Sequence, residues 1–185
     1  YTTLFRSVPV NPVLKGPQAQ HILCDCNVRV LVTSAERATA LYDILGACPD
    51  LQHVVIVGDA PVPALPPTLA GVAWRDWICA GHPANFHRVI DQDMAAIFYT
   101  SGSTGRPKGV VLSHSNMVTG AESVVQYLEN RASDRLLAVL PFSFDYGFSQ
   151  LSTAFHVGAS VVLMDYLFPR DVLNLVVNER ISGLA

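Results

Sequence analysis

The sequence feature that most limits the fold is a regular alternation of short apolar runs with helical segments. The runs are rich in Val, Ile, Leu and Ala, a composition typical of buried strands. We expect strands at residues 28–33, 53–58, 93–100, 109–113, 135–140 and 159–164. Helical periodicity between these runs predicts helices that cover both faces of the sheet. The predicted fold class is therefore α/β, with a partial, mainly parallel sheet flanked by helices.

Local signals predict where several helices begin and end. A capping-box pattern that starts at Thr33 opens a helix that Gly46 closes. Pro169 occupies the first position of a last helix, which Gly183 ends. Residues 69–87 carry no clear pattern. Apolar residues at helical spacing predict further helices at residues 19–27, 117–128 and 147–156.

Composition narrows the class of protein. The 185-residue chain has a net charge of −3, with 50% hydrophobic and 15% charged residues. This balance suits one globular domain with a sizeable core, and it argues against a nucleic-acid partner. No apolar run approaches the roughly 18 residues that span a bilayer, and no secretory signal opens the chain, so we expect a cytoplasmic protein. The four cysteines show no metal-ligand spacing and are expected to be buried free thiols.

Both ends of the sequence look artificial. Back-translated, YTTLFRS looks like the end of a widely used short-read sequencing adapter, so residues 1–7 are expected to be a remnant of library construction. The alternative is a genuine N-terminal segment. At the other end, ERISGLA stops where a helix has just finished and an apolar run begins. We therefore expect residues 8–185 to be an incomplete domain encoded by a gene fragment.

One stretch, YTSGSTGRPKG, differs from its apolar surroundings. It begins with the last two residues of the predicted strand AAIFYT, and ligands in α/β proteins bind beyond the carboxyl ends of strands. Its glycines can take positive φ, its hydroxyl groups can donate hydrogen bonds, and its lysine adds a positive charge. Together these groups suit a polyphosphate. The candidate phosphate-binding residues are Thr100, Ser101, Gly102, Ser103, Thr104, Gly105, Lys108 and Gly109.

This loop is not a Walker A motif, which needs Gly, four residues and then Gly-Lys-Ser/Thr. Counted from Gly102, Pro107 stands where the second Gly should be, and Gly109 follows Lys108 in place of a hydroxyl residue. The glycine spacing also fails the Rossmann fingerprint. From the residues alone, a phosphate-binding loop and a flexible linker both stay open.

The same stretch closely resembles the signature loop of the acyl-adenylate-forming (AMP-binding) superfamily: acyl-CoA synthetases, luciferases and amino-acid-adenylating domains. The resemblance extends over about residues 8–185, and the SHSN that follows resembles the family's helix start. The segments VPVNPVLK, CNVRVLVTSAER and LLAVLPFSFDYGFSQL look most like the acyl-CoA ligases associated with exosortase gene clusters. The resemblance implies that residues 8–185 are an incomplete part of the large N-terminal AMP-binding domain, with the C-terminal domain absent.

The resemblance also implies a reaction. Members of the superfamily activate a carboxylic acid with ATP and Mg²⁺ as an acyl-adenylate, and then transfer the acyl group to CoA or to a phosphopantetheinyl carrier protein. The loop would hold the β- and γ-phosphates of ATP. The family's adenine-binding segment, ribose-binding Asp and C-terminal lysine have no counterpart here, so the chain alone is expected to be inactive. We expect an AMP-forming acyl-CoA ligase; the alternatives are an amino-acid-adenylating enzyme and a non-catalytic nucleotide-binding module.

A second candidate segment, LPFSFDYGFSQL, follows the predicted strand RLLAVL. Its aromatic residues could belong to the core or line an acyl pocket, and the family's substrate-binding segment lies here, which favours the pocket. In amino-acid-adenylating relatives an Asp after Phe pairs with the substrate ammonium group, and Phe144-Asp145 matches that pattern. A buried Asp without a cation would be costly, although Asp145 could instead cap a helix. The candidate pocket residues are Phe142, Phe144, Asp145, Tyr146 and Gly147.

His114 lies just past the stretch YTSGSTGRPKG, here named the Ser/Gly loop. It could reach the substrate or cap the helix that begins there, and we favour the structural role. The sequence identifies no metal site. It also leaves the particular acid, the thiol acceptor and the oligomeric state open.

Overall fold

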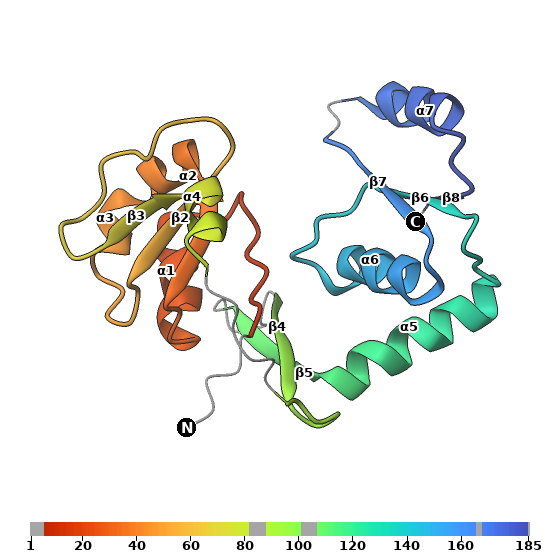
Figure 1. Ribbon diagram of the computed structural model, residues 1–185, viewed down its shortest axis with the longest axis horizontal. Coiled ribbons are helices and arrows are strands. Elements are labelled where there is room, and N and C mark those ends of the chain that lie inside the picture. The colour runs from red at the N-terminus through yellow and green to blue at the C-terminus, as the bar shows by residue number, and fades with distance from the viewer. Residues whose placement is uncertain (1–5, 82–87, 101–106, 166–167, 185) are drawn as a thin grey trace. The chain divides into compact units, whose positions relative to one another are not determined.

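The computed structural model describes residues 6–81, 88–100, 107–165 and 168–184, and the chain divides into two compact units (Figure 1). Unit 1 comprises residues 1–11, 88–100 and 108–185; unit 2 comprises residues 12–87 and 101–107. Each unit contains a parallel sheet with helices beside it, which confirms the predicted α/β class. Within the described ranges, no helix is long and apolar enough to cross a membrane.

Unit 2 is built on a three-stranded parallel sheet in the order β1-β2-β3. The strands are β1 (Val30–Ser34), β2 (His53–Val57) and β3 (Ala70–Ala73). The helices are α1 (Gly16–Asp25), α2 (Ala35–Ala40), α3 (Tyr42–Leu45) and α4 (Trp74–Cys79). The valine-rich sequences of β1 and β2 explain the central strand pair, because β-branched side chains pack well on a pleated surface.

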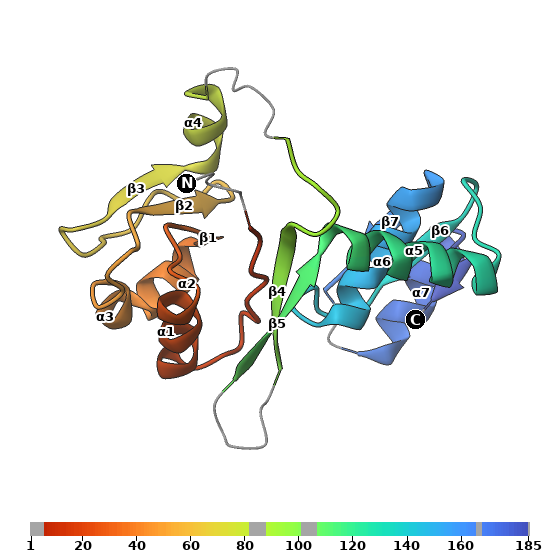
Figure 2. The same ribbon diagram turned by 90° about the horizontal axis from the view of Figure 1, so that it is seen from below.

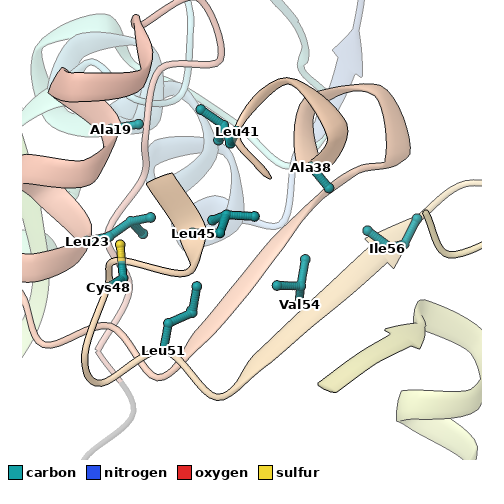
Figure 3. Packing of buried hydrophobic residues seen from close by; sticks show 9 residues of the cluster. All are labelled: Ala19, Leu23, Ala38, Leu41, Leu45, Cys48, Leu51, Val54 and Ile56. Atoms are coloured by element: carbon teal, nitrogen blue, oxygen red, sulfur yellow. The ribbon is translucent and has the colours of Figure 1, made fainter. Parts of the chain in front are cut away.

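The hydrophobic core of unit 2 lies between the sheet and helices α1 to α3 (Figure 3). Four of its residues, Ala38, Leu45, Val54 and Ile56, have no solvent-exposed surface. The complete cluster is Ala19, Leu23, Ala38, Leu41, Leu45, Cys48, Leu51, Val54 and Ile56. These residues alternate along β2 and recur at helical spacing, so one face of each element closes the core.

Two sequence predictions for unit 2 need correction. The helix cap is Ser34, the last residue of β1, whose hydroxyl accepts a hydrogen bond from the Arg37 amide, and not Thr33. The predicted single helix is also two short helices, α2 and α3, separated at Leu41. In addition, the region without a clear pattern contains β3 and α4.

The prediction that all four cysteines are buried free thiols is right for Cys48 and wrong for the other three. None of the four forms a disulfide; Cys24 and Cys26 are half-buried, and Cys79 on α4 is exposed.

Unit 1 contains an antiparallel pair, β4 with β5, and a parallel sheet in the order β7-β6-β8. The strands are β4 (Met94–Thr100), β5 (Lys108–Ser113), β6 (Arg135–Ala138), β7 (Ser160–Leu163) and β8 (Gly183–Leu184). The helices are α5 (His114–Leu128), α6 (Asp145–Val157) and α7 (Pro169–Asn178). Helices α6 and α7 lie on opposite sides of the parallel sheet (Figure 1), as expected for consecutive crossovers in opposite directions.

Helix α6 is the central packing element of unit 1, because it contacts α5, β6 and β7. The buried Ala154 of α6, Ala121 of α5 and Leu137 of β6 contribute to this core. Ser7 forms an isolated parallel bridge with Ala96 of β4. Whether residues 1–7 derive from an adapter stays a prediction.

The predicted start of the last helix is confirmed, and its predicted end is wrong. Pro169 is its first residue, as expected, but the helix ends at Asn178 rather than at Gly183. Gly183 instead pairs with Leu136 in the parallel sheet, and an added Cβ would lie 2.5 Å from the Leu136 side chain. The glycine therefore serves close strand packing and not the end of a helix.

Candidate functional site

The two ends of the Ser/Gly loop are held by a β-hairpin. Strands β4 and β5 pair in antiparallel fashion, with Thr100 opposite Lys108 and Tyr99 opposite Gly109 (Figure 2). Thr100 is therefore the last residue before the loop, and Lys108 is the first residue of the strand after it. The remaining predicted phosphate-binding residues lie outside the described residues: Ser101, Gly102, Ser103, Thr104 and Gly105.

Gly109 is required by packing rather than by backbone conformation. Glycine can take positive φ, but among the described glycines only Gly58 and Gly158 do so. A Cβ on Gly109 would lie 2.8 Å from Cγ2 of Ile97 and 3.2 Å from the ring of Tyr99. A larger residue would therefore push apart the strands that hold the ends of the loop.

Lys108 presents its charge to solvent. The residue is exposed, and within the described part of the chain no carboxylate lies within ion-pair distance of it. An ammonium group at the end of a flexible stem is suited to a mobile anionic ligand. The geometry is thus compatible with phosphate binding at the loop.

The second candidate segment forms a tight turn that leads into α6. The Phe144 amide donates to the Pro141 carbonyl at 3.0 Å, and the Phe148 amide donates to the Phe144 carbonyl at 2.9 Å. Gly147 is buried in this turn, and a Cβ there would lie 2.3 Å from the Pro141 carbonyl oxygen. Glycine is therefore needed where the first turn of α6 meets the preceding backbone.

The aromatic side chains of this segment fall into two groups. Phe144 and Tyr146 are 52% and 53% exposed, so they are not core residues of the described structure. Phe142 and Phe148 are half-buried. An acyl pocket lined by these residues stays a prediction, with Phe144 and Tyr146 as the side chains accessible to a substrate.

Asp145 is the first residue of α6, and its carboxylate is exposed. It is not the N-cap, which is Phe144, although its Oδ1 accepts a hydrogen bond from the Tyr146 amide at 2.9 Å. The amino end of a helix favours a negative charge. Because the carboxylate remains in solvent, it carries no large desolvation cost, and a substrate amine is not required to stabilise it.

A ring contact joins the two candidate segments. Phe98 of β4 meets Phe148 of α6 edge to face, with ring centroids 5.3 Å apart and an interplanar angle of 69°. Phe98 is buried and lies two residues before Thr100; Phe148 lies three residues after Asp145. This pair was not predictable from the sequence, because no local pattern reveals a contact between residues so far apart in the chain.

His114 does not cap α5. Ser113 is the cap, with its hydroxyl accepting from the Asn116 amide at 3.1 Å and its own amide donating to Asn116 Oδ1 at 3.0 Å. The Ser-x-x-Asn spacing carried this signal. His114 instead donates its backbone amide to the Asp93 carbonyl.

Comparisons with known proteins identify the family. The model of the AMP-binding enzyme family matches residues 5–185. The chain is 33% identical over 179 residues to an L-proline--[L-prolyl-carrier protein] ligase of Streptomyces coelicolor, covering 94% of this chain and 32% of that protein. It is 31% identical over 159 residues to a benzoate--CoA ligase of Thauera aromatica, covering 85% of this chain and 29% of that protein.

A solved structure agrees with this result. The anthranilate CoA ligase AuaEII in complex with anthranoyl-AMP matches with a TM-score of 0.83 and 28% identity, over 95% of this chain and 34% of that one. The chain thus spans about a third of the length of these relatives. Acyl-CoA ligases and an amino-acid-activating ligase both appear among them. By its sequence and its fold, this chain belongs to the AMP-binding enzyme family.

Proposed function

We propose that the chain is part of the N-terminal domain of a larger acid–thiol ligase, which uses ATP to activate a carboxylic acid and transfers the acyl group to CoA. The observation that carries the proposal is the β4–β5 hairpin, which places Thr100 and the exposed Lys108 at the two ends of one Ser/Gly-rich loop. The family match and the anthranilate and benzoate ligases among its relatives support the same reaction class. Three segments quoted above support a closer relation to exosortase-associated ligases.

In this function the loop binds the β- and γ-phosphates of ATP while the carboxylate attacks the α-phosphate. Lys108 and the loop hydroxyl groups offset the charge of the departing pyrophosphate. Fixed donors of this kind contribute about 3 kcal/mol each to a transition state in which charge develops. The Phe98–Phe148 contact holds the strand before the loop against the helix that bears the predicted acyl-binding residues.

Magnesium fits this proposal as a companion of ATP. Within the described ranges, no three His, Cys, Asp or Glu side chains gather into a metal-binding group. Mg²⁺ commonly binds one or two carboxylates together with substrate phosphates, so it needs no such group. When bound, it neutralises part of the phosphate charge.

Asp145 favours a second candidate, an enzyme that adenylates an amino acid and loads it onto a carrier protein. Its exposed carboxylate stands at the amino end of α6, beside the exposed Phe144 and Tyr146. There it is accessible to a substrate ammonium group. The match to a prolyl-carrier-protein ligase supports this alternative.

Carboxylate-dependent ATP–pyrophosphate exchange by the complete protein tests both candidates. The panel pairs benzoate with anthranilate, and each amino acid with its deaminated analogue. Exchange with acids that lack an amine, unchanged in Asp145→Asn, supports the acyl-CoA ligase. Exchange with an amino acid but not with its analogue, lost in Asp145→Asn, supports the amino-acid-adenylating enzyme. No exchange with any acid, despite ATP binding, would refute both and leave a nucleotide-binding module.

A further inference from the structure

Two of the four thiols of this chain are neighbours inside unit 2. Cys24 lies near the end of α1, and Cys48 lies in the connection after α3. Cys24 packs against the core cluster that contains Cys48, and the two thiols lie close enough for Cys24 to contribute to the raised pKa of Cys48. In Figure 3 the Cys48 sulfur points toward Leu23, the residue that precedes Cys24 on α1.

The two thiols differ in their surroundings. Cys48 is only 5% exposed, and its Sγ donates to the Ile44 carbonyl at 3.3 Å. Burial, with a smaller contribution from Cys24, raises the pKa of the Cys48 thiol to about 12. Cys24 is half-buried, so it is the thiol of the pair that a small oxidant can reach.

We propose that Cys24 and Cys48 form an oxidation site, at which hydrogen peroxide converts the neighbouring thiols into a disulfide. The Cys24 thiolate attacks the peroxide oxygen, the O–O bond breaks, and Cys24 becomes a sulfenic acid while the first water leaves. The Cys48 sulfur then attacks the Cys24 sulfur. An S–S bond forms, the S–O bond breaks, and the second water leaves with the Cys48 proton. Two thiols lose two electrons and two protons, and the peroxide becomes two waters.

The surroundings of the pair determine how this site behaves. Because the Cys48 thiol loses its proton reluctantly, the second step is slow at neutral pH and accelerates as the pH rises. The product is apolar and lies at the edge of an apolar core, so soluble thiols reach it poorly. The bridge joins α1 to the segment after α3 and restricts the unfolded chain between them, which stabilises unit 2. This site shares no residue with the proposed ATP-binding loop and goes beyond the proposed function.

A two-thiol variant of the 185-residue chain tests the proposal. Cys26→Ser with Cys79→Ser leaves only Cys24 and Cys48, on the tryptic peptides 16–29 and 38–75. After mild hydrogen peroxide, we expect mass spectrometry to find these peptides joined, with faster joining at pH 8.5 than at pH 7. We expect the oxidised form to melt roughly 5–10 °C above the reduced form.

A matched control separates a built site from random oxidation. Cys24→Ser with Cys79→Ser leaves Cys26 and Cys48. A side chain two residues further along a helix points to another face, so a bridge between Cys26 and Cys48 should form at least tenfold more slowly. Circular dichroism confirms that both variants are folded. Equal rates of bridge formation in the two variants would overturn the proposal. The proposal would also fail if the urea-unfolded wild-type chain forms a bridge between Cys24 and Cys48 and the folded chain does not.

Discussion

Gly147→Ala tests how the start of α6 is fixed. The new Cβ would lie 2.3 Å from the Pro141 carbonyl oxygen, 2.9 Å from its carbon and 3.0 Å from the Leu140 carbonyl oxygen. All three are backbone atoms, so the clash cannot be relieved by turning a side chain. Because only backbone can move, the overpacking cost lies at the upper end of its usual range, about 3 kcal/mol, whereas the intrinsic helix preference for Ala over Gly returns only about 1 kcal/mol. We expect a net loss of about 2 kcal/mol in the free energy of unfolding.

Urea denaturation of the 185-residue chain, followed by circular dichroism, measures this loss. Gly120→Ala is the matched control, because Gly120 lies inside α5 and nothing surrounds its Cβ position within 4 Å. The control should gain about 0.5–1 kcal/mol from helix propensity alone. If Gly147→Ala is as stable as Gly120→Ala, the described packing of α6 against the preceding turn is wrong.

Three further predictions test the packing and the electrostatics. Leu45→Ala, in the core of unit 2, should lower the free energy of unfolding by about 2–5 kcal/mol in urea titrations. The control Leu173→Ala, at a residue 65% exposed on α7, should change it by less than about 0.5 kcal/mol. Equal effects would contradict the assigned core. Gly109→Ala should speed amide hydrogen exchange in β4 and β5, because its Cβ would meet Ile97 at 2.8 Å; unchanged exchange would show that the hairpin tolerates it. Burial raises the pKa of the Cys48 thiol to about 12 in the folded chain, from an ordinary value of 9.0. Above pH 9 the unfolded chain therefore loses a proton that the folded chain keeps, so the free energy of unfolding should fall as the pH rises. This part of the decline should vanish in Cys48→Ala and persist in Cys79→Ala; an unaltered decline in Cys48→Ala would refute it.

The alternation of strands and helices was predictable because it depends on local periodicity. Apolar β-branched runs and the proline at position 169 carry their signal within a few residues. The exact caps were less predictable. At Thr33-Ser34 both hydroxyl residues suit a cap and both pair with β2, and Ser34 is the cap because α2 begins at the residue after it.

Features that depend on contacts between distant segments could not be predicted. The reason for Gly109 lies on the facing strand, in Ile97 and Tyr99, and the reason for Gly183 lies in Leu136. The desolvation cost expected for Asp145 assumed that its carboxylate is buried. The carboxylate is exposed, because it lies in the turn that begins α6. Sequence therefore indicated which residues matter, while tertiary packing determined why.

The proposal that the Ser/Gly loop holds the phosphates of ATP is tested most directly by lysine footprinting. The sequence contains two lysines, Lys15 and Lys108, so each chain carries its own internal control. The complete protein is treated with an amine-acetylating reagent in the presence of ATP, AMP or neither, and both sites are quantified by mass spectrometry. We expect ATP to protect Lys108 at least fivefold, AMP to protect it far less, and Lys15 to react equally throughout. Equal acetylation of Lys108 with and without saturating ATP would contradict the phosphate-binding role of the loop.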